Sequence, residues 1–148
     1  TPDVASLMYR SGFKTIRISL ESNRIDIQKA SDLKATNTQF IMACQALHQA
    51  GFSTKDIGVY LLAMLPGQHF REVEEAIRFV ISNGAYPYLC EYTPIPGTPM
   101  FNEALKYQPL LSEEPLLQNN SAFPCSWNCF TKEDLDRLKH LRRDLINA

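Results

Sequence analysis

The stretch "IGVYLLAMLPG", residues 57–67, is an apolar run that ends in a Pro–Gly turn. Its apolar side chains fall on both faces of an extended chain, which is typical of a strand buried in a parallel sheet. Residues 38–50 before it and 70–83 after it repeat apolar positions with helical spacing, and each run is followed by a glycine, Gly51 or Gly84. The stretch therefore predicts a helix–strand–helix unit.

The same order of elements occurs on both sides of this unit. Residues 3–11, capped by Asp3, predict a helix that ends at Gly12, and "KTIRISLES" after it predicts a strand. "YPYLCEYTPIPGTP" begins with a further strand. The three helices end in "SGF", "AGF" and "NGA", so the succession helix–Gly–strand is repeated. This succession predicts an α/β fold with three parallel strands and flanking helices.

Composition limits the classes of function. The chain has 148 residues, of which 15 are basic and 16 acidic, and this near balance argues against a nucleic-acid module with a basic face. No apolar run approaches the roughly 18–20 residues of a membrane span. Four separated cysteines are too few for a disulfide scaffold, so we expect a reducing, cytoplasmic location. The three histidines fall in separate helical segments and are interpreted as surface residues.

The first predicted strand has one polar face. Its apolar residues alternate with Arg17, Ser19 and Glu21. A strand packed between helices would be apolar on both faces, whereas a barrel-wall strand turns its polar face toward a lumen that holds ligand. The pattern favours the wall of a partial, TIM-like βα barrel. From the pattern alone, an edge strand with a solvated polar face is the alternative.

Three strand ends would meet at one rim of such a barrel. Glu21 ends the first strand, and Pro66 with Gly67 forms a turn into a helix whose first amides could receive a polar or anionic group. Glu91 ends the third strand. We expect its carboxylate to face the lumen, because a charge turned toward the helices would cost several kcal/mol. Read alone, the turn at Pro66 is an ordinary strand-to-helix connection.

Taken in order, "IRISLES", "LPGQ" and "YTPIPGTPMF" resemble the second half of the barrel of radical S-adenosylmethionine (radical SAM) enzymes. The nearest group often carries a cobalamin-binding domain upstream, and the resemblance covers about residues 5–101. It implies a partial (β/α)6 barrel in which a CxxxCxxC loop binds a [4Fe–4S] cluster. It also implies that this cluster chelates S-adenosylmethionine and yields a 5′-deoxyadenosyl radical on reduction.

The resemblance implies cofactor-binding residues, but none that is catalytic and none that binds metal: Arg17, Ser19, Glu21, Arg24, Pro66, Gly67 and Glu91. Ser19 and Glu21 would contact the ribose hydroxyls or the methionyl part of the cofactor, since a carboxylate accepts two hydrogen bonds at once. Arg17 or Arg24 would pair with the methionyl carboxylate. The turn at Pro66 and Gly67 would lie near the adenine, and Glu91 would stand at the end of the sixth strand.

The chain departs from the family pattern in three ways. Met64 stands where the family often has Gly, and His69 where it often has Thr. No CxxxCxxC precedes "SLES". We therefore expect residues 1–101 to be the last three βα units of a radical SAM barrel, with residues 102–148 forming an irregular segment and a C-terminal helix that packs on it. Such a fragment of a longer enzyme would be inactive alone and would self-associate through its open strand edge. The substrate is not indicated.

"CSWNC", residues 125–129, has the first spacing of CxxxCxxC, but Lys132 stands where the third cysteine would fall. The stretch also follows the last strand rather than the first. We interpret Cys125 and Cys129 as structural thiols before a helix that Thr131 and Asp134 cap. Two alternatives remain: a structural zinc site that includes these cysteines, and a small, complete, non-catalytic α/β ligand-binding module.

Overall fold

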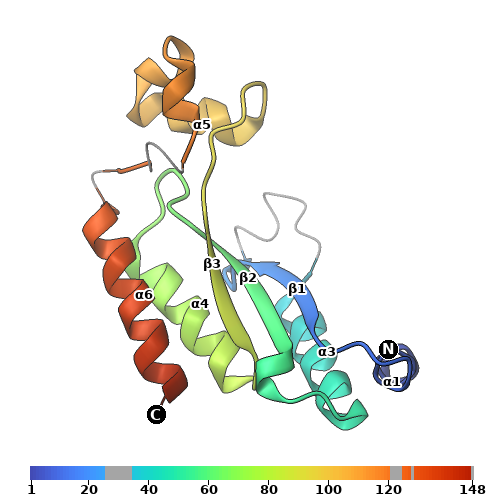
Figure 1. The fold of residues 1–148 in the computed structure, drawn as a ribbon. Helices are drawn as coiled ribbons and strands as arrows, with labels where there is room; N and C mark the ends of the chain where they lie inside the picture. The colour runs from blue at the N-terminus through green and yellow to red at the C-terminus, as the bar shows by residue number, and fades with distance from the viewer. Residues whose placement is uncertain (26–34, 121–124, 128, 148) are drawn as a thin grey trace.

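The computed structural model describes residues 1–25, 35–120, 125–127 and 129–147 (Figure 1). No helix in this part of the chain combines the length and apolarity needed to cross a bilayer. The main elements, in chain order, are α1 (Pro2–Arg10), β1 (Ile16–Glu21), α3 (Asn37–Ala50), β2 (Ile57–Ala63), α4 (Phe70–Ser82), β3 (Tyr86–Glu91), α5 (Pro99–Tyr107) and α6 (Lys132–Asn147). Short 3₁₀ turns occupy Thr54–Asp56 (η1), Pro109–Ser112 (η2) and Pro115–Gln118 (η3).

The three strands form one open sheet in the order β1–β2–β3. β2 pairs in parallel with both neighbours, with Ile57 opposite Ile16 and Gly58 opposite Tyr86. The predicted fold class, three parallel strands with flanking helices, is therefore confirmed. Because the strands are parallel, their carboxyl ends lie at the same edge of the sheet.

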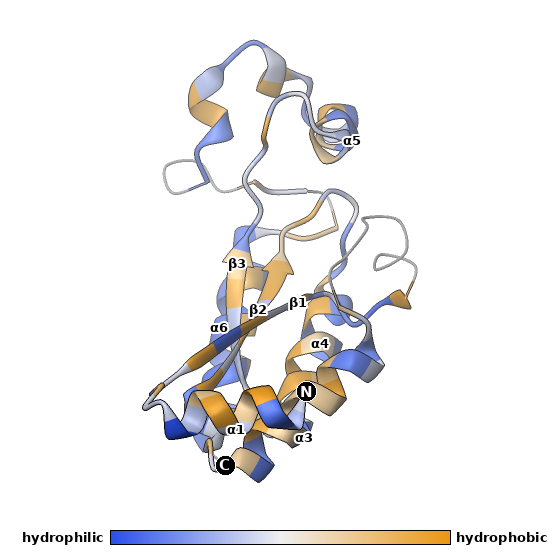
Figure 2. Ribbon diagram, turned by 90° about the vertical axis from the view of Figure 1, so that its right-hand side faces the viewer, coloured by the Kyte–Doolittle hydropathy of each residue, from blue (hydrophilic) through white to orange (hydrophobic). Residues whose placement is uncertain are grey.

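The two faces of the sheet differ. Val59, Leu61 and Ala63 of β2 point to the face where α4 packs, and they are buried. α3 and α4 lie behind the sheet in Figure 1, and α6 packs beside α4 and β3. On the opposite face Tyr60 is 42% exposed and Arg17 is also exposed. The polar face of β1 thus lies on the open face, where a barrel would have its lumen; β2 carries the hydrophobic colour in Figure 2.

The helix starts differ from the sequence expectation. α1 is capped by Thr1, whose Oγ1 accepts a hydrogen bond from the Val4 amide at 3.4 Å, and Asp3 lies within the first turn. Pro2 explains the shift, since proline has no N–H to lose at the first helical position. α3 likewise starts one residue early, with Thr36 as its cap.

α5 is a helix whose second half lies in the segment that the sequence predicted to be irregular. The Thr98 side chain accepts a hydrogen bond from the Phe101 amide at 3.1 Å, and Pro99 occupies the first helical position. The three prolines of "TPIPGTP", residues 93–99, are typical of a rigid loop, but the last of them is the first residue of a helix. In Figure 1, α5 lies beyond the carboxyl ends of the strands.

The predicted cap of α6 is confirmed. The Thr131 amide donates to Asp134 Oδ2 at 3.1 Å, and the Asp134 amide donates to Thr131 Oγ1 at 3.3 Å. The bond from the Thr131 amide is the main reason why the pKa of Asp134 lies below its usual value.

His48 is more than a surface residue. Its ring lies between two carbonyl oxygens, with Nε2 2.9 Å from that of Gly84 and Nδ1 3.1 Å from that of Phe52. These contacts join the end of α3 to the turn before β3. Gly84 has φ of 71°, and a Cβ there would lie 2.5 Å from Nε2. His48 is exposed, as the interpretation of the histidines as surface residues expected, and its ring in addition joins two segments of the chain.

We expect His48→Ala to lower the free energy of unfolding by about 1 kcal/mol, because it removes the ring from between the part-buried Phe52 carbonyl and the exposed Gly84 carbonyl. Urea denaturation measures this change. His140→Ala is the matched control, since His140 is exposed on α6 and contacts Arg143 of the same helix. Equal stabilities of the two variants would contradict the bridging role.

Candidate functional site

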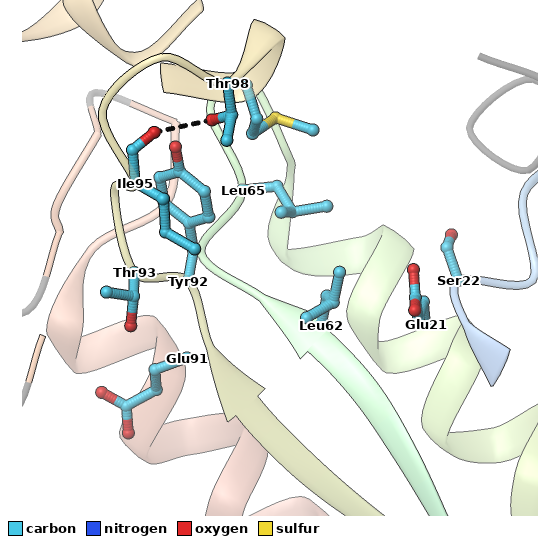
Figure 3. Close-up of a pocket in the computed structure, with 10 residues that line it drawn as sticks. Glu21, Ser22, Leu62, Leu65, Glu91, Tyr92, Thr93, Ile95 and Thr98 are labelled. Carbon is cyan, nitrogen blue, oxygen red and sulfur yellow. Dashed lines mark hydrogen bonds between the residues drawn. The ribbon is translucent and has the colours of Figure 1, made fainter. Parts of the chain in front are cut away.

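A cavity of about 420 Å³ opens at the carboxyl ends of the three strands (Figure 3). Its centre is apolar, and polar groups come from the end of β1 and from the segment after β3. The lining residues are Glu21, Ser22, Leu62, Leu65, Glu91, Tyr92, Thr93, Ile95, Thr98 and Met100. The volume lies within the range usual for small-molecule sites.

The end of β1 presents a carboxylate from a tight turn. Glu21 has φ of 64°, and the Ser22 amide donates to the Leu20 carbonyl at 2.7 Å across it. A side chain other than glycine in this conformation is strained, and such strain gathers at functional sites. Ser19 Oγ donates to Glu21 Oε1 at 3.3 Å, so the structure brings together these two predicted site residues.

The turn after β2 is closed on itself. Gln68 is 4% exposed; its Oε1 accepts from the Leu65 amide at 3.1 Å, and its Nε2 donates to the Leu62 carbonyl at 3.2 Å. The Gln68 amide donates to Leu65, and the His69 amide to Glu72 Oε2. These amides of the turn already have partners within the protein, whereas the expectation that the first amides of α4 receive a polar or anionic group stays a prediction. Pro66 and Gly67 lie within this turn, beside the cavity-lining Leu65.

"CSWNC" packs against this turn. Trp127 Nε1 donates to the Met64 carbonyl at 2.8 Å, and Cys129 Sγ donates to the Gln68 carbonyl at 3.4 Å. Met64 needs this support because its φ is 66°. On the other side, the Tyr107 ring lies 5.7 Å from that of Trp127. The C-terminal segment and α5 therefore hold the turn that forms one wall of the cavity.

The cysteines do not gather into a metal site in the described residues. No group of three or more histidine, cysteine or acidic side chains with ligand geometry occurs there. Cys125 is 4% exposed, and burial raises the pKa of its thiol to about 11. A buried, protonated thiol is a poor ligand and a poor nucleophile, which agrees with a structural thiol.

Glu91 does not face the lumen. Its Oε1 accepts a hydrogen bond from Lys139 Nζ of α6 at 2.8 Å, and Figure 3 shows the carboxylate turned away from Leu62 and Glu21. The expectation was wrong because it counted the cost of a charge among helices without a partner. Lys139, 48 residues along the chain, supplies that partner. Glu91 touches the cavity only at its edge.

The two arginines proposed for the cofactor carboxylate have partners inside the protein. Arg17 donates to the Tyr88 hydroxyl at 3.2 Å and stacks over that ring at 4.8 Å. Arg17 lies opposite Gly58, near the start of β2, and a Cβ at position 58 would collide with the Arg17 side chain. Arg24 pairs with Glu72 at the start of α4. Neither arginine lines the cavity.

Sequence reasoning missed Tyr92, which directly follows β3. Its ring is 8% exposed, and its hydroxyl has no hydrogen-bond partner among the described residues. Desolvation, with a smaller contribution from nearby Cys125, raises the pKa of this phenol to about 12. The sequence does place Tyr92 at the end of a strand, in "EYTPIPGTP", where ligand-binding residues of a barrel lie. An aromatic residue at such a position is, however, equally typical of the hydrophobic core.

Comparison with known proteins supports the fold. No family model and no curated protein sequence matches the chain. Among solved structures, coproporphyrinogen III oxidase from Escherichia coli, described as a radical SAM enzyme, matches with a TM-score of 0.66 and 12% sequence identity. The match covers 98% of this chain and 30% of that enzyme. At this identity the likeness establishes the fold: the chain is folded like part of a radical SAM enzyme.

We expect Trp127→Phe to lower the free energy of unfolding by about 1–3 kcal/mol, because it leaves the buried Met64 carbonyl without its donor. Chemical denaturation measures the loss. Tyr107→Phe alters the same aromatic cluster but keeps the indole N–H, so it serves as the control. If Trp127→Phe were as stable as this control, the hydrogen bond would not support the turn.

Proposed function

We propose that this chain is the C-terminal part of a radical SAM barrel and that its rim cavity binds the adenosyl portion of S-adenosylmethionine. The cavity at the carboxyl ends of three parallel strands carries this proposal, because enzymes built on βα barrels place their ligands at that rim. The fold likeness to part of a radical SAM enzyme supports it.

The polar and apolar parts of the cavity suit a nucleoside. Leu62, Leu65 and Met100 offer an apolar surface on which a flat base can lie. Glu21 at the β1 side offers a carboxylate that accepts two hydrogen bonds, as vicinal ribose hydroxyls require. Ser19 orients this carboxylate through its hydrogen bond to Oε1. In this proposal the Pro66–Gly67 turn shapes the base pocket without donating amides to it.

The described residues do not fit a [4Fe–4S] cluster. Cys44 is buried in α3, Cys90 lies within β3, Cys125 is buried, and Cys129 donates to the turn after β2. Because these thiols are not assembled into a ligand set, we assign this chain no step that runs through a cluster. We propose instead that it contributes to cofactor binding. An upstream cobalamin domain stays a prediction without an observation, no substrate is indicated, and nothing favours the alternative of a non-catalytic binding module.

The division of the chain follows from the same proposal. Residues 1–101 supply the strands and the cavity, as the last three βα units of the barrel. Residues 102–148 pack on them through Trp127 at the rim and through α6 along α4. We propose that this second part stabilises the rim and contributes to reading the substrate.

Binding of adenosine tests the role of Glu21. We expect Glu21→Gln to weaken adenosine binding about tenfold, because a charged acceptor of two hydrogen bonds becomes a neutral amide. Isothermal titration calorimetry measures the dissociation constant. Glu103→Gln is the matched control, since that carboxylate pairs with Lys106 on the exposed side of α5. Wild-type protein that bound adenosine and 2′,3′-dideoxyadenosine equally well would rule out a carboxylate–diol contact.

The sheet edge at β1 generates a second test. Among the described strands β1 pairs only with β2, so its outer edge presents unpaired backbone groups. We expect the chain to self-associate through this edge, with a mass that rises with concentration in light scattering and returns to the monomer value on dilution. A monomeric mass at every concentration would contradict this expectation.

A further inference from the structure

Tyr92 is held rigidly at the β3 side of the cavity. Its amide donates to the Ala63 carbonyl at 2.9 Å, which extends the pairing of β3 with β2 by one residue. Its ring lies 6.4 Å from that of Trp127, and Trp127 is itself fixed by its bond to Met64. The position of the phenol is therefore set by the backbone and by the aromatic cluster.

In the part of the chain that the structure describes, the hydroxyl of Tyr92 has no hydrogen-bond partner, although the residue is more than nine-tenths buried. Burying a hydroxyl without a hydrogen bond lowers stability, so such groups are rare in folded proteins and call for an explanation. Its high pKa keeps the phenol neutral at physiological pH, so it is able to donate a hydrogen bond there.

Of the other polar side chains on the β3 side of the cavity, Thr93 is exposed, whereas Thr98 and Glu91 are committed to internal bonds. Thr98 Oγ1 donates to the Ile95 carbonyl at 2.8 Å and accepts from the Phe101 amide at 3.1 Å. Glu91 is bound to Lys139. Figure 3 shows the Tyr92 hydroxyl at the end of the cavity where Ile95 and Thr98 lie. Of these polar side chains, Tyr92 alone has a buried hydrogen-bonding group left for a ligand.

We propose that the Tyr92 hydroxyl donates a hydrogen bond to a ring nitrogen of a heterocyclic base bound in the cavity, and so selects the ligand at the β3 side. This inference rests on the proposed adenosyl site. Neighbouring strands lie about 4.8 Å apart, so the ends of β1 and β3 are separated by roughly 10 Å. A nucleoside spans this separation with its diol on Glu21 and its base edge on Tyr92.

The variant Tyr92→Phe distinguishes a hydroxyl that binds ligand from a hydroxyl that stabilises the fold, because the two roles predict different changes in melting temperature. If the hydroxyl is unpartnered in the free protein, its removal leaves the melting temperature unchanged or raises it by roughly 2–4 °C. A hydroxyl that stabilises the fold would instead give a lower melting temperature, which would overturn the inference. Tyr60→Phe is the matched control, because Tyr60 lies on the open face of β2 outside the cavity.

The ligand measurement uses adenosine and its 1-deaza, 3-deaza and 7-deaza analogues. We expect Tyr92→Phe to weaken adenosine binding about fivefold, as the loss of one neutral hydrogen bond predicts. One analogue should bind wild-type protein about fivefold less tightly than adenosine, and that difference should vanish in Tyr92→Phe. Tyr60→Phe should bind all four ligands as wild type does.

Three other outcomes are decisive. If wild type and Tyr92→Phe bind adenosine equally, the inference fails while the adenosyl site stands. If all deaza analogues bind wild type as tightly as adenosine, the hydroxyl does not meet a ring nitrogen and the inference fails in the same way. If wild type binds no adenosine, the proposed function and the inference that rests on it both fail.

Discussion

Parallel pairing of β2 with both neighbours is the constraint on which the rest of the structure depends. It places the ends of three strands, about 70 residues apart from first to last, at one edge of the sheet. Glu21, Leu65 and Tyr92 lie at or just after the ends of three different strands. Parallel pairing brings these strand ends together, so the three residues line one cavity. Tyr92 even extends the pairing by one bond to Ala63, so the ladder itself positions a cavity residue.

The rim is also the most strained part of the described chain, and the C-terminal region compensates for that strain. Glu21 and Met64 are its two non-glycine residues with positive φ, and each follows or ends a strand. Such backbone persists when surrounding contacts determine it. Trp127 supplies one such contact through the Met64 carbonyl, and Gln68 closes the same turn from inside. "CSWNC" therefore matters through its tryptophan, since the indole bonds to the strained residue.

The fold could be predicted from sequence because its signals are local. Apolar periodicity, glycines after helices and one polar strand face each depend on residues within a few positions of one another. The site was predictable only in part, since Ser19 and Glu21 share one strand and do meet. Glu91 was misread, and the contact of His48 was not foreseen, because their partners Lys139 and Gly84 are distant in sequence. The Tyr92 hydroxyl, which has no partner among the described residues, has no sequence signal, since it is defined by what surrounds it in space.

The charges around the cavity indicate what kind of ligand it favours. Among the described residues, its lining holds two carboxylates and no basic side chain. Lys139 balances Glu91, whereas Glu21 accepts a hydrogen bond from the neutral hydroxyl of Ser19. Among the described residues that line the cavity, Glu21 therefore places a negative charge at the β1 side, which disfavours a bound anion there and favours a neutral or cationic ligand. A nucleoside joined to a positive sulfonium meets that requirement, and a nucleotide with phosphates beside Glu21 does not. In the proposed adenosyl site, the methionyl carboxylate would accordingly lie away from Glu21.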